Sequence, residues 1–221
     1  MSKVVVITGA SRGIGLSFSK RYKAQGFTVY ALCRKATVEL ESLHVNIIDG
    51  VDVATDEGIG KMVAALKGVP IDLLINNAGI LANESLGSID KNSIRQQFEV
   101  NALAPLVVTE ALMGQFCAHA KLAIITSRMG SVADNTSGGR YGYRMSKAAL
   151  NIASVSLAQD LKSIGVAVAI LHPGLVGTEM IGGYGDITPD QAAERLVQRI
   201  EELTLATSGT FWHSNGEVLP W

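Results

Sequence analysis

Thr8-Gly9-Ala10-Ser11-Arg12-Gly13-Ile14-Gly15 decides the fold, because it joins an apolar run at residues 4–8 to a helical pattern at residues 13–24. Glycine permits backbone angles that other residues resist, and the N-terminus of a helix carries partial positive charge. A pyrophosphate can therefore approach the amide groups of such a turn. The spacing differs from the GxGxxG of other dinucleotide folds and also fits an ordinary glycine-rich turn. Its position after the first strand favours the phosphate-binding interpretation.

Short β-branched runs alternate with helical stretches along the rest of the chain. The predicted strands are residues 4–8, 28–32, 45–48, 72–76, 122–126 and 166–171, and the predicted helices are residues 13–24, 55–66, 91–118, 143–164 and 189–203. Several strands are almost wholly apolar, which is typical of a parallel sheet with helices on both faces. Asn215-Gly216 near the C-terminus predicts a further chain reversal beside the sheet edge. We expect an α/β, doubly wound Rossmann fold with a mostly parallel seven-stranded sheet.

Length, composition and charge limit the number of domains and the kinds of partner that the chain can have. The chain has 221 residues, 48% of them hydrophobic, which favours one dinucleotide-binding domain over residues 1–221. A net charge of -1 gives no footprint for a polyanion, so we expect no nucleic-acid partner. No apolar run is long enough to span a bilayer, and a first run at Val4 leaves no room for a signal peptide, which predicts a cytoplasmic protein. Cys33 and Cys117 are too few for a disulfide framework or a zinc site, so we expect core thiols and no metal.

The end of the second predicted strand indicates the cofactor. An acidic residue there would bind the ribose hydroxyls of NAD, but this chain has Cys33-Arg34-Lys35. The guanidinium of Arg34 can bind a 2′-phosphate through charge-assisted hydrogen bonds, and Arg12 can close on the same phosphate. The pattern favours NADP(H) over NAD. The alternative is that Arg34 is a solvated surface charge and the cofactor preference is relaxed.

The motifs, taken in order, resemble the short-chain dehydrogenase/reductase family over essentially the whole chain. They are the glycine turn, Asp52-Val53, Asn76-Asn77-Ala78-Gly79, Asn101, Ser127, Tyr143-(x3)-Lys147 and Pro173-Gly174-(x3)-Thr178. The resemblance implies a cofactor site formed by Gly9, Ser11, Arg12, Gly13, Ile14, Gly15, Arg34, Asp52, Val53, Asn77, Ala78, Gly79, Tyr143, Lys147, Pro173, Gly174, Val176 and Thr178. Asn76 is expected to be structural.

Tyr143 and Lys147 are four residues apart and therefore share one face of a helix. A nearby ammonium group favours ionisation of a phenol, so we expect Lys147 to lower the pKa of Tyr143 and make it a general acid and base. The family resemblance implies that Ser127 orients the substrate oxygen and that Asn101 holds a water chain behind Lys147. Tyr141 is the rival phenol, but the residue four positions later is Met145 rather than lysine.

Two stretches of the sequence are expected to shape the substrate side of the site. The stretch at residues 134–139 lengthens the usual spacing between Ser127 and Tyr143, and the glycine-dense residues 177–187 predict a short, mobile substrate loop. Met129, Met180, Ile181 and Tyr184 are expected pocket walls, with packing as the alternative. Phe211, Trp212 and Trp221 belong to a C-terminal pattern that resembles the small C-factor and Sniffer-type carbonyl reductase branch. We expect these aromatic residues in the core or in a subunit contact.

Two functions are consistent with these residues. One is an NADPH-dependent reductase of aldehydes, ketones or quinones acting on a small-molecule carbonyl or alcohol substrate. The alternative is a dinucleotide-binding regulatory protein of the C-factor type with incidental turnover. Surplus apolar residues on the helices at 91–118 and 143–164 predict a homodimer or homotetramer; these are Leu103, Leu106, Val107, Leu112, Ala148, Ala149, Ile152, Val155 and Leu157. Both stripes could instead be satisfied within one subunit.

Overall fold

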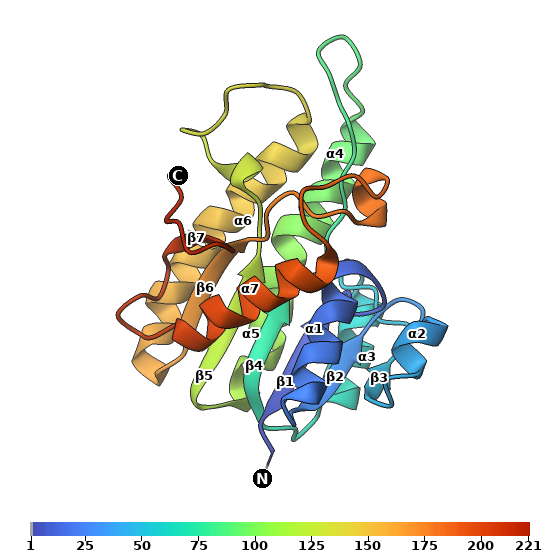
Figure 1. The fold of residues 1–221 in the computed structure, drawn as a ribbon, viewed down its shortest axis with the longest axis vertical. Helices are drawn as coiled ribbons and strands as arrows, with labels where there is room; N and C mark the ends of the chain where they lie inside the picture. The colour runs from blue at the N-terminus through green and yellow to red at the C-terminus, as the bar shows by residue number, and fades with distance from the viewer. Residues whose placement is uncertain (1) are drawn as a thin grey trace.

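A computed structural model describes residues 2–221 and contains one seven-stranded sheet in the order β3-β2-β1-β4-β5-β6-β7 (Figure 1). The strands are β1 (Val4–Thr8), β2 (Thr28–Leu32), β3 (Asn46–Ile48), β4 (Ile71–Asn76), β5 (Phe116–Ile125), β6 (Ala167–His172) and β7 (Phe211–His213). Every neighbouring pair runs parallel, so the sheet is wholly rather than mostly parallel. The predicted doubly wound α/β fold is confirmed.

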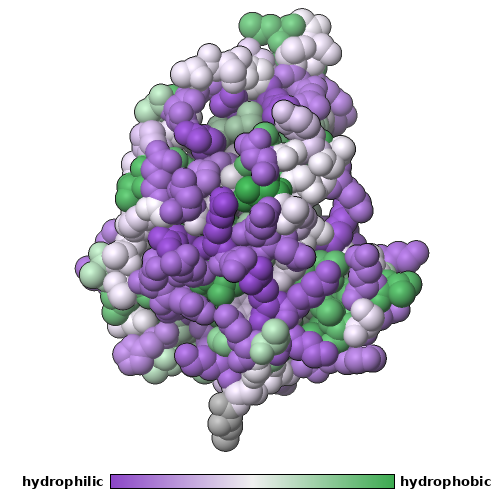
Figure 2. All heavy atoms as spheres, in the orientation of Figure 1, coloured by the Kyte–Doolittle hydropathy of each residue, from purple (hydrophilic) through white to green (hydrophobic). Residues whose placement is uncertain are grey.

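Helices cover both faces of the sheet. They are α1 (Gly13–Ala24), α2 (Val38–Glu41), α3 (Asp56–Ala65), α4 (Lys91–Phe98), α5 (Ala104–Leu112), α6 (Tyr141–Asp160) and α7 (Pro189–Glu202). One apolar core lies between the sheet and α1, α2 and α7, and a second lies between the sheet and α3, α5 and α6. Helices α1 and α7 lie side by side in Figure 1, and the face that they form is mostly hydrophilic in Figure 2.

The single helix predicted over residues 91–118 is wrong. Helix α4 passes into a π-helical turn at Glu99–Leu103, α5 follows, and a 3-10 turn at Met113–Gln115 ends the helical segment. Strand β5 begins at Phe116, where it pairs with Ile71 of β4, so sheet pairing ends the helix earlier than the apolar pattern suggested. The π-turn contains Asn101, and such turns are frequent at functional sites.

Helix α6 begins at Tyr141, two residues before the predicted start, and ends at Asp160 before a 3-10 turn at Leu161–Ile164. Helix α2 was not predicted, because four residues are too few to show a helical period. The expected start of α7 is confirmed: Thr188 and Gln191 form a reciprocal capping box.

The C-terminal segment packs on the sheet edge. Phe211 is buried, Trp212 packs against the core, and the Trp221 ring stacks on Phe211 with centroids 5.2 Å apart. The predicted reversal at Asn215-Gly216 is confirmed by an antiparallel bridge between Trp212 and Val218.

The two cysteines differ in their surroundings. Cys33 is a buried thiol as predicted, but the expectation of a core thiol is wrong for Cys117, which is half-buried at the start of β5. No helix within residues 2–221 combines the length and apolarity needed to cross a bilayer.

Candidate active site

The loops at the carboxyl ends of the strands surround a cavity of about 1240 Å³. The strand order reverses between β1 and β4, which is where parallel α/β sheets place their ligand crevice. Residues that follow β1, β2, β4, β5 and β6 all line this cavity. The motifs quoted from the sequence therefore converge on one site.

The glycine loop at the end of β1 forms a cradle in this cavity. Gly9 and Gly13 have positive φ angles of 65° and 54°, which glycine adopts readily. A Cβ atom on Gly9 would lie 2.9 Å from the Cα of Ala78, so a side chain there would collide with the turn after β4. Gly15 does not line the cavity; a Cβ on it would lie 2.2 Å from the carbonyl oxygen of Gly9. The space and exposed backbone fit a pyrophosphate, and Gly15 allows the close helix packing beneath it.

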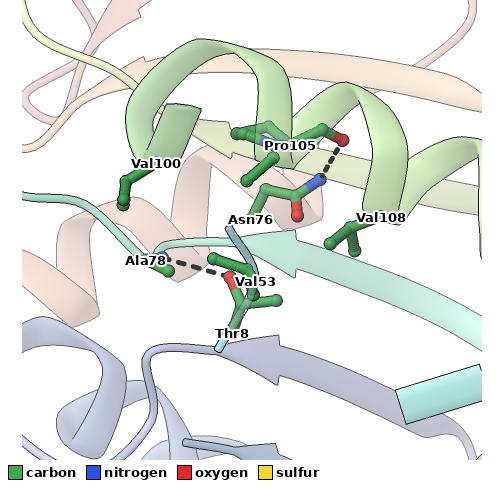
Figure 3. A pocket seen from close by; sticks show the side chains of 8 residues that line it. Thr8, Val53, Asn76, Ala78, Val100, Pro105 and Val108 are labelled. Carbon is green, nitrogen blue, oxygen red and sulfur yellow. Dashed lines mark hydrogen bonds between the residues drawn. The ribbon is translucent and has the colours of Figure 1, made fainter. Parts of the chain in front are cut away.

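Side-chain hydrogen bonds join the ends of β1 and β4 (Figure 3). The Thr8 hydroxyl accepts from the Ala78 backbone amide at 3.1 Å, as Figure 3 shows. It also accepts from the Asn77 backbone amide at 3.0 Å, and Asn77 Nδ2 donates to the Thr8 carbonyl. Asn76 points the other way, toward α5, where its Nδ2 donates to the Pro105 carbonyl at 3.3 Å. Asn76 is thus structural, as predicted, and Asn77 supports the glycine loop.

Basic residues line the end of the cavity next to β2. Arg34 and Lys35 are exposed there, and Asp52 and Val53 line the adjacent wall. Arg12 also lines the cavity, but its Nη1 lies 2.6 Å from Oε2 of Glu179 in the loop after β6. Both side chains of this pair are largely exposed, so water screens the attraction and Arg12 can exchange Glu179 for a phosphate at small cost.

Ser127, Tyr143 and Lys147 meet in the same cavity. Ser127 follows β5, while α6 holds Tyr143 and Lys147 one turn apart. All three are buried, and Lys147 Nζ donates to the Ile125 carbonyl at 3.0 Å and lies 5.8 Å from the centre of the Tyr143 ring. Tyr141, the rival phenol, is the first residue of α6 and does not line the cavity.

Asn101 lies behind this group rather than in the cavity wall. Its amide accepts from the Ile80 backbone N–H at 2.8 Å and donates to the Ile80 carbonyl and to Ser146 of α6. A Cβ on Gly79 would lie 3.3 Å from Asn101 Oδ1 and 3.8 Å from Lys147 Nζ, so these two side chains approach Gly79 together. The π-turn therefore ties the segment after β4 to the helix that carries Tyr143.

Burial shifts the pKa values of both helix residues. Burial lowers the pKa of Lys147 to about 8, since an ammonium group loses its hydration there. Burial raises the pKa of Tyr143, whereas a hydrogen bond with Ser127 and the charge of Arg140 lower it. Burial is the largest of these causes and the net shift is upward, so the expectation that Lys147 lowers the pKa of Tyr143 is wrong.

The expected substrate walls are mostly in place. Met129, Met180 and Ile181 line the cavity, but Tyr184 does not and is 74% exposed. The loop at residues 177–187 contains a 3-10 turn at Glu179–Ile181 that the sequence analysis did not predict. Its ends are joined where Gly177 N–H donates to the Ile187 carbonyl at 2.9 Å. Closure of this loop over a ligand stays a prediction.

Sequence reasoning missed several residues of this site, namely Glu84, Arg128, Arg140, His172 and His213. Glu84 is a buried carboxylate that contacts the start of α6, and the other four line the cavity. His172 and His213 form an edge-to-face pair with centroids 4.9 Å apart. The one sequence pattern that could have drawn attention to Arg140 is the Gly138-Gly139 pair before it.

Comparison with known proteins agrees with this geometry. Residues 3–188 match the profile described as short chain dehydrogenase. The chain belongs to the short-chain dehydrogenase family. Within this oxidoreductase family, it is 41% identical over 227 residues to 1-hydroxy-2-glutathionyl-2-methyl-3-butene dehydrogenase of Rhodococcus sp. (strain AD45), with complete coverage of both chains. It is also 41% identical over 155 residues to C-signal of Myxococcus xanthus, covering 69% of this chain and 93% of that one.

Solved structures of short-chain dehydrogenases have the same fold. NADPH-bound carbonyl reductase from chicken fatty liver superposes with a TM-score of 0.90 at 29% identity, covering 100% of this chain and 99% of that one. Carbonyl reductase Sniffer of D. melanogaster gives a TM-score of 0.88 at 26% identity with complete coverage of both chains. These similarities confirm the predicted C-factor and Sniffer-type branch.

Proposed function

We propose that this short-chain dehydrogenase is an NADPH-dependent reductase of aldehydes, ketones or quinones with Tyr143 as the proton donor. The observation that carries the proposal is the convergence of Ser127, Tyr143 and Lys147 in a cavity that also contains the glycine cradle. A carbonyl oxygen placed between the Ser127 and Tyr143 hydroxyls would receive two hydrogen bonds. Such donors stabilise the negative charge that develops on that oxygen during reduction.

Each residue of the group then has a defined role. Tyr143 donates its phenolic proton to the substrate oxygen in reduction and removes a proton in oxidation, and Ser127 orients that oxygen. Lys147 and Asn101 support the positions of these two residues. Lys147 Nζ donates to the Ile125 carbonyl at the end of β5, and Asn101 accepts from the Ile80 backbone N–H. When bound, the nicotinamide supplies the hydride in reduction.

NADP(H) is the cofactor we assign to the cradle. Arg34 and Arg12 line the end of the cavity where the 2′-phosphate would lie, and Thr178 lines its other wall. Carboxylate groups suited to the ribose hydroxyls of NAD are missing from residues 33–35. The chicken fatty liver reductase, which has the same fold, binds NADPH.

The test is NADPH consumption with a panel of aldehydes, ketones and quinones. Tyr143→Phe should abolish measurable turnover and leave NADPH affinity near that of the native protein, because the phenol faces the substrate more than the cofactor. Tyr141→Phe is the matched control, since it removes the neighbouring hydroxyl outside the cavity, and should keep native turnover. Retention of most activity by the Tyr143→Phe variant would refute the assignment.

A second candidate is oxidation of an alcohol that carries a glutathionyl group. It is favoured by 41% identity, over the whole of both chains, to the Rhodococcus dehydrogenase named for such a compound. The same residues serve both directions, with Tyr143 as base in oxidation. NADP⁺-dependent oxidation of S-(2-hydroxyethyl)glutathione tests this candidate.

The similarity to C-signal raises the regulatory alternative. A regulator without catalysis would gain nothing from a buried Lys147 and Tyr143, because both cost desolvation. Cofactor binding without turnover of any compound on the panel would favour the regulatory alternative over the reductase.

We also propose that the chain assembles into a dimer or tetramer through α4, α5 and α6. Leu103 in the π-turn between α4 and α5, Leu106 of α5 and Ile152 of α6 remain exposed, at 47%, 39% and 67%. Leu112, which the sequence analysis counted among the contact residues, is fully buried in the core and is excluded from this surface. Burial of the exposed residues in a two-fold contact would remove them from water.

A further inference from the structure

Arg140 has an unusual backbone conformation directly before the catalytic helix. Gly138, Gly139 and Arg140 have successive φ angles of 63°, 64° and 49°. Glycine tolerates this left-handed region, but arginine has a Cβ atom, and the conformation is strained for such a residue. Arg140 is the N-cap residue of α6 and lies three residues before Tyr143. Strain of this kind persists only where neighbouring groups hold it.

A distant segment at residues 83–84 and the neighbouring Arg144 hold the Arg140 turn in place. Its backbone N–H donates to the Glu84 carbonyl at 2.8 Å, and its Nε donates to Asn83 Oδ1 at 3.0 Å. On the other side, Arg144 Nε lies 3.2 Å from both the Gly138 and Gly139 carbonyl oxygens. Asn83 thus holds the Arg140 side chain, while Glu84 and Arg144 hold the strained turn that carries it.

The guanidinium of Arg140 has no carboxylate partner among the ion pairs of residues 2–221. The neighbouring acids are already engaged: Glu84 accepts from Ser93, Gln97 and the Gly142 amide, and Asp134 pairs with Arg128 at 2.7 Å. Nη1 of Arg140 contacts only the weak acceptor Met129 Sδ, at 3.8 Å. Strong donors of this side chain therefore remain available at the cavity wall.

We propose that Arg140 is a carboxylate-binding residue of the substrate site, and that the substrates are carbonyl compounds or alcohols that bear a carboxylate. This inference rests on the proposed oxidoreductase function and names its substrate class. Arg140 lines the same cavity as Ser127 and Tyr143 and lies three residues before Tyr143. Met129, which Arg140 Nη1 contacts, donates its backbone N–H to Ser127 Oγ, so the three side chains surround one part of the cavity. The guanidinium fork can donate two parallel hydrogen bonds to a carboxylate. A glutathionyl alcohol, which carries two carboxylates, belongs to this class.

A matched pair of aldehydes tests the inference. In 4-carboxybenzaldehyde and methyl 4-formylbenzoate the ring and aldehyde are the same, but only the first carries a negative charge. Calorimetry on the NADP⁺ complex measures binding without turnover. The native protein should prefer the carboxylate, and Arg140→Gln should weaken carboxylate binding about tenfold or more while changing ester binding less than about twofold. Arg140→Lys, which keeps the charge without the fork, should recover part of the preference.

Arg95→Gln is the matched control, because Arg95 is an exposed arginine on α4 that contacts Asn92 and does not line the cavity. It should keep the native preference. For each variant, kcat/KM for NADPH oxidation is then measured with both aldehydes. An effect of Arg140 on Tyr143 changes both values alike, so the ratio of the two kcat/KM values reports only the preference for the carboxylate.

The outcomes separate the two proposals. The inference is supported if Arg140→Gln loses the preference for the carboxylate while the native protein and Arg95→Gln keep it. Equal preference in the native and Arg140→Gln proteins, or no preference in the native protein, overturns the carboxylate site and leaves the reductase standing if both aldehydes are reduced. Carboxylate-selective binding that depends on Arg140, without turnover of either aldehyde, supports the site and counts against the proposed reductase.

Discussion

Replacing Glu84 by alanine should destabilise the protein and disturb the start of the catalytic helix. Glu84 is 4% exposed, and its carboxylate links α4 to α6. Oε1 accepts from Ser93 Oγ and from Gln97 Nε2, each at 2.7 Å, and Oε2 accepts from the Gly142 backbone N–H at 3.1 Å. Helix α6 has no side-chain cap of its own, so Glu84 provides from a distance the acceptor that an N-cap usually supplies.

The expected loss of unfolding free energy follows from the hydrogen-bond donors that lose their acceptor in Glu84→Ala. Ser93 can rotate its hydroxyl to another acceptor, but the Gly142 amide has no alternative, and Gln97 keeps only longer contacts of 3.3 and 3.4 Å. A buried donor without an acceptor costs about 1–3 kcal/mol, so two of them place the loss near 3 kcal/mol of unfolding free energy. Glu84→Gln should lose about half as much by this reasoning, because its amide oxygen can still accept from Gly142.

Urea denaturation followed by circular dichroism, at one protein concentration, measures the loss. Glu57→Ala is the control, because Glu57 is exposed on α3 and its removal should change stability by less than about 0.5 kcal/mol. Turnover of folded Glu84→Ala should fall more than NADPH affinity, since Gly142 adjoins Tyr143 rather than the glycine cradle. An unchanged denaturation midpoint for Glu84→Ala would refute the account of this carboxylate as the tie between α4 and α6.

Three further outcomes are expected. Arg34→Ala should remove most of the preference for NADPH over NADH, about tenfold or more in affinity, and equal affinities in the native protein, measured by fluorescence titration, would contradict it. Burial, with the charges of His213 and Arg128, lowers the pKa of His172 to about 3 against the opposing charge of Asp134, so the folded state loses stability as pH falls from about 6.5 toward 3. Urea midpoints across this range should fall less steeply for His172→Asn than for the native protein, and identical slopes would exclude His172 as the cause. Ile152→Asp should shift sedimentation from an oligomer to the 23.3 kDa species; a native protein that already sediments at this mass would refute the assembly.

The sequence alone determined the features that depend on neighbouring residues. The glycine loop follows a five-residue apolar strand, and the angles it needs are visible as glycines at fixed positions. Tyr143 and Lys147 share a helix face because four residues separate them, and the alternation of apolar strands with helices indicated a parallel sheet. Each of these patterns repeats over a few residues, so no knowledge of distant contacts is required.

Only the tertiary structure decided the features that join distant residues. Glu84 and Gly142 are 58 positions apart, and Arg12 and Glu179 are 167 apart, so no local pattern predicts either contact. The helix predicted to Ala118 ends before Phe116 because pairing with β4 outweighs helical preference, as tertiary contacts often do. The pKa of Lys147 is lowered because the fold buries its ammonium group, and burial depends on how the strands and helices pack around it.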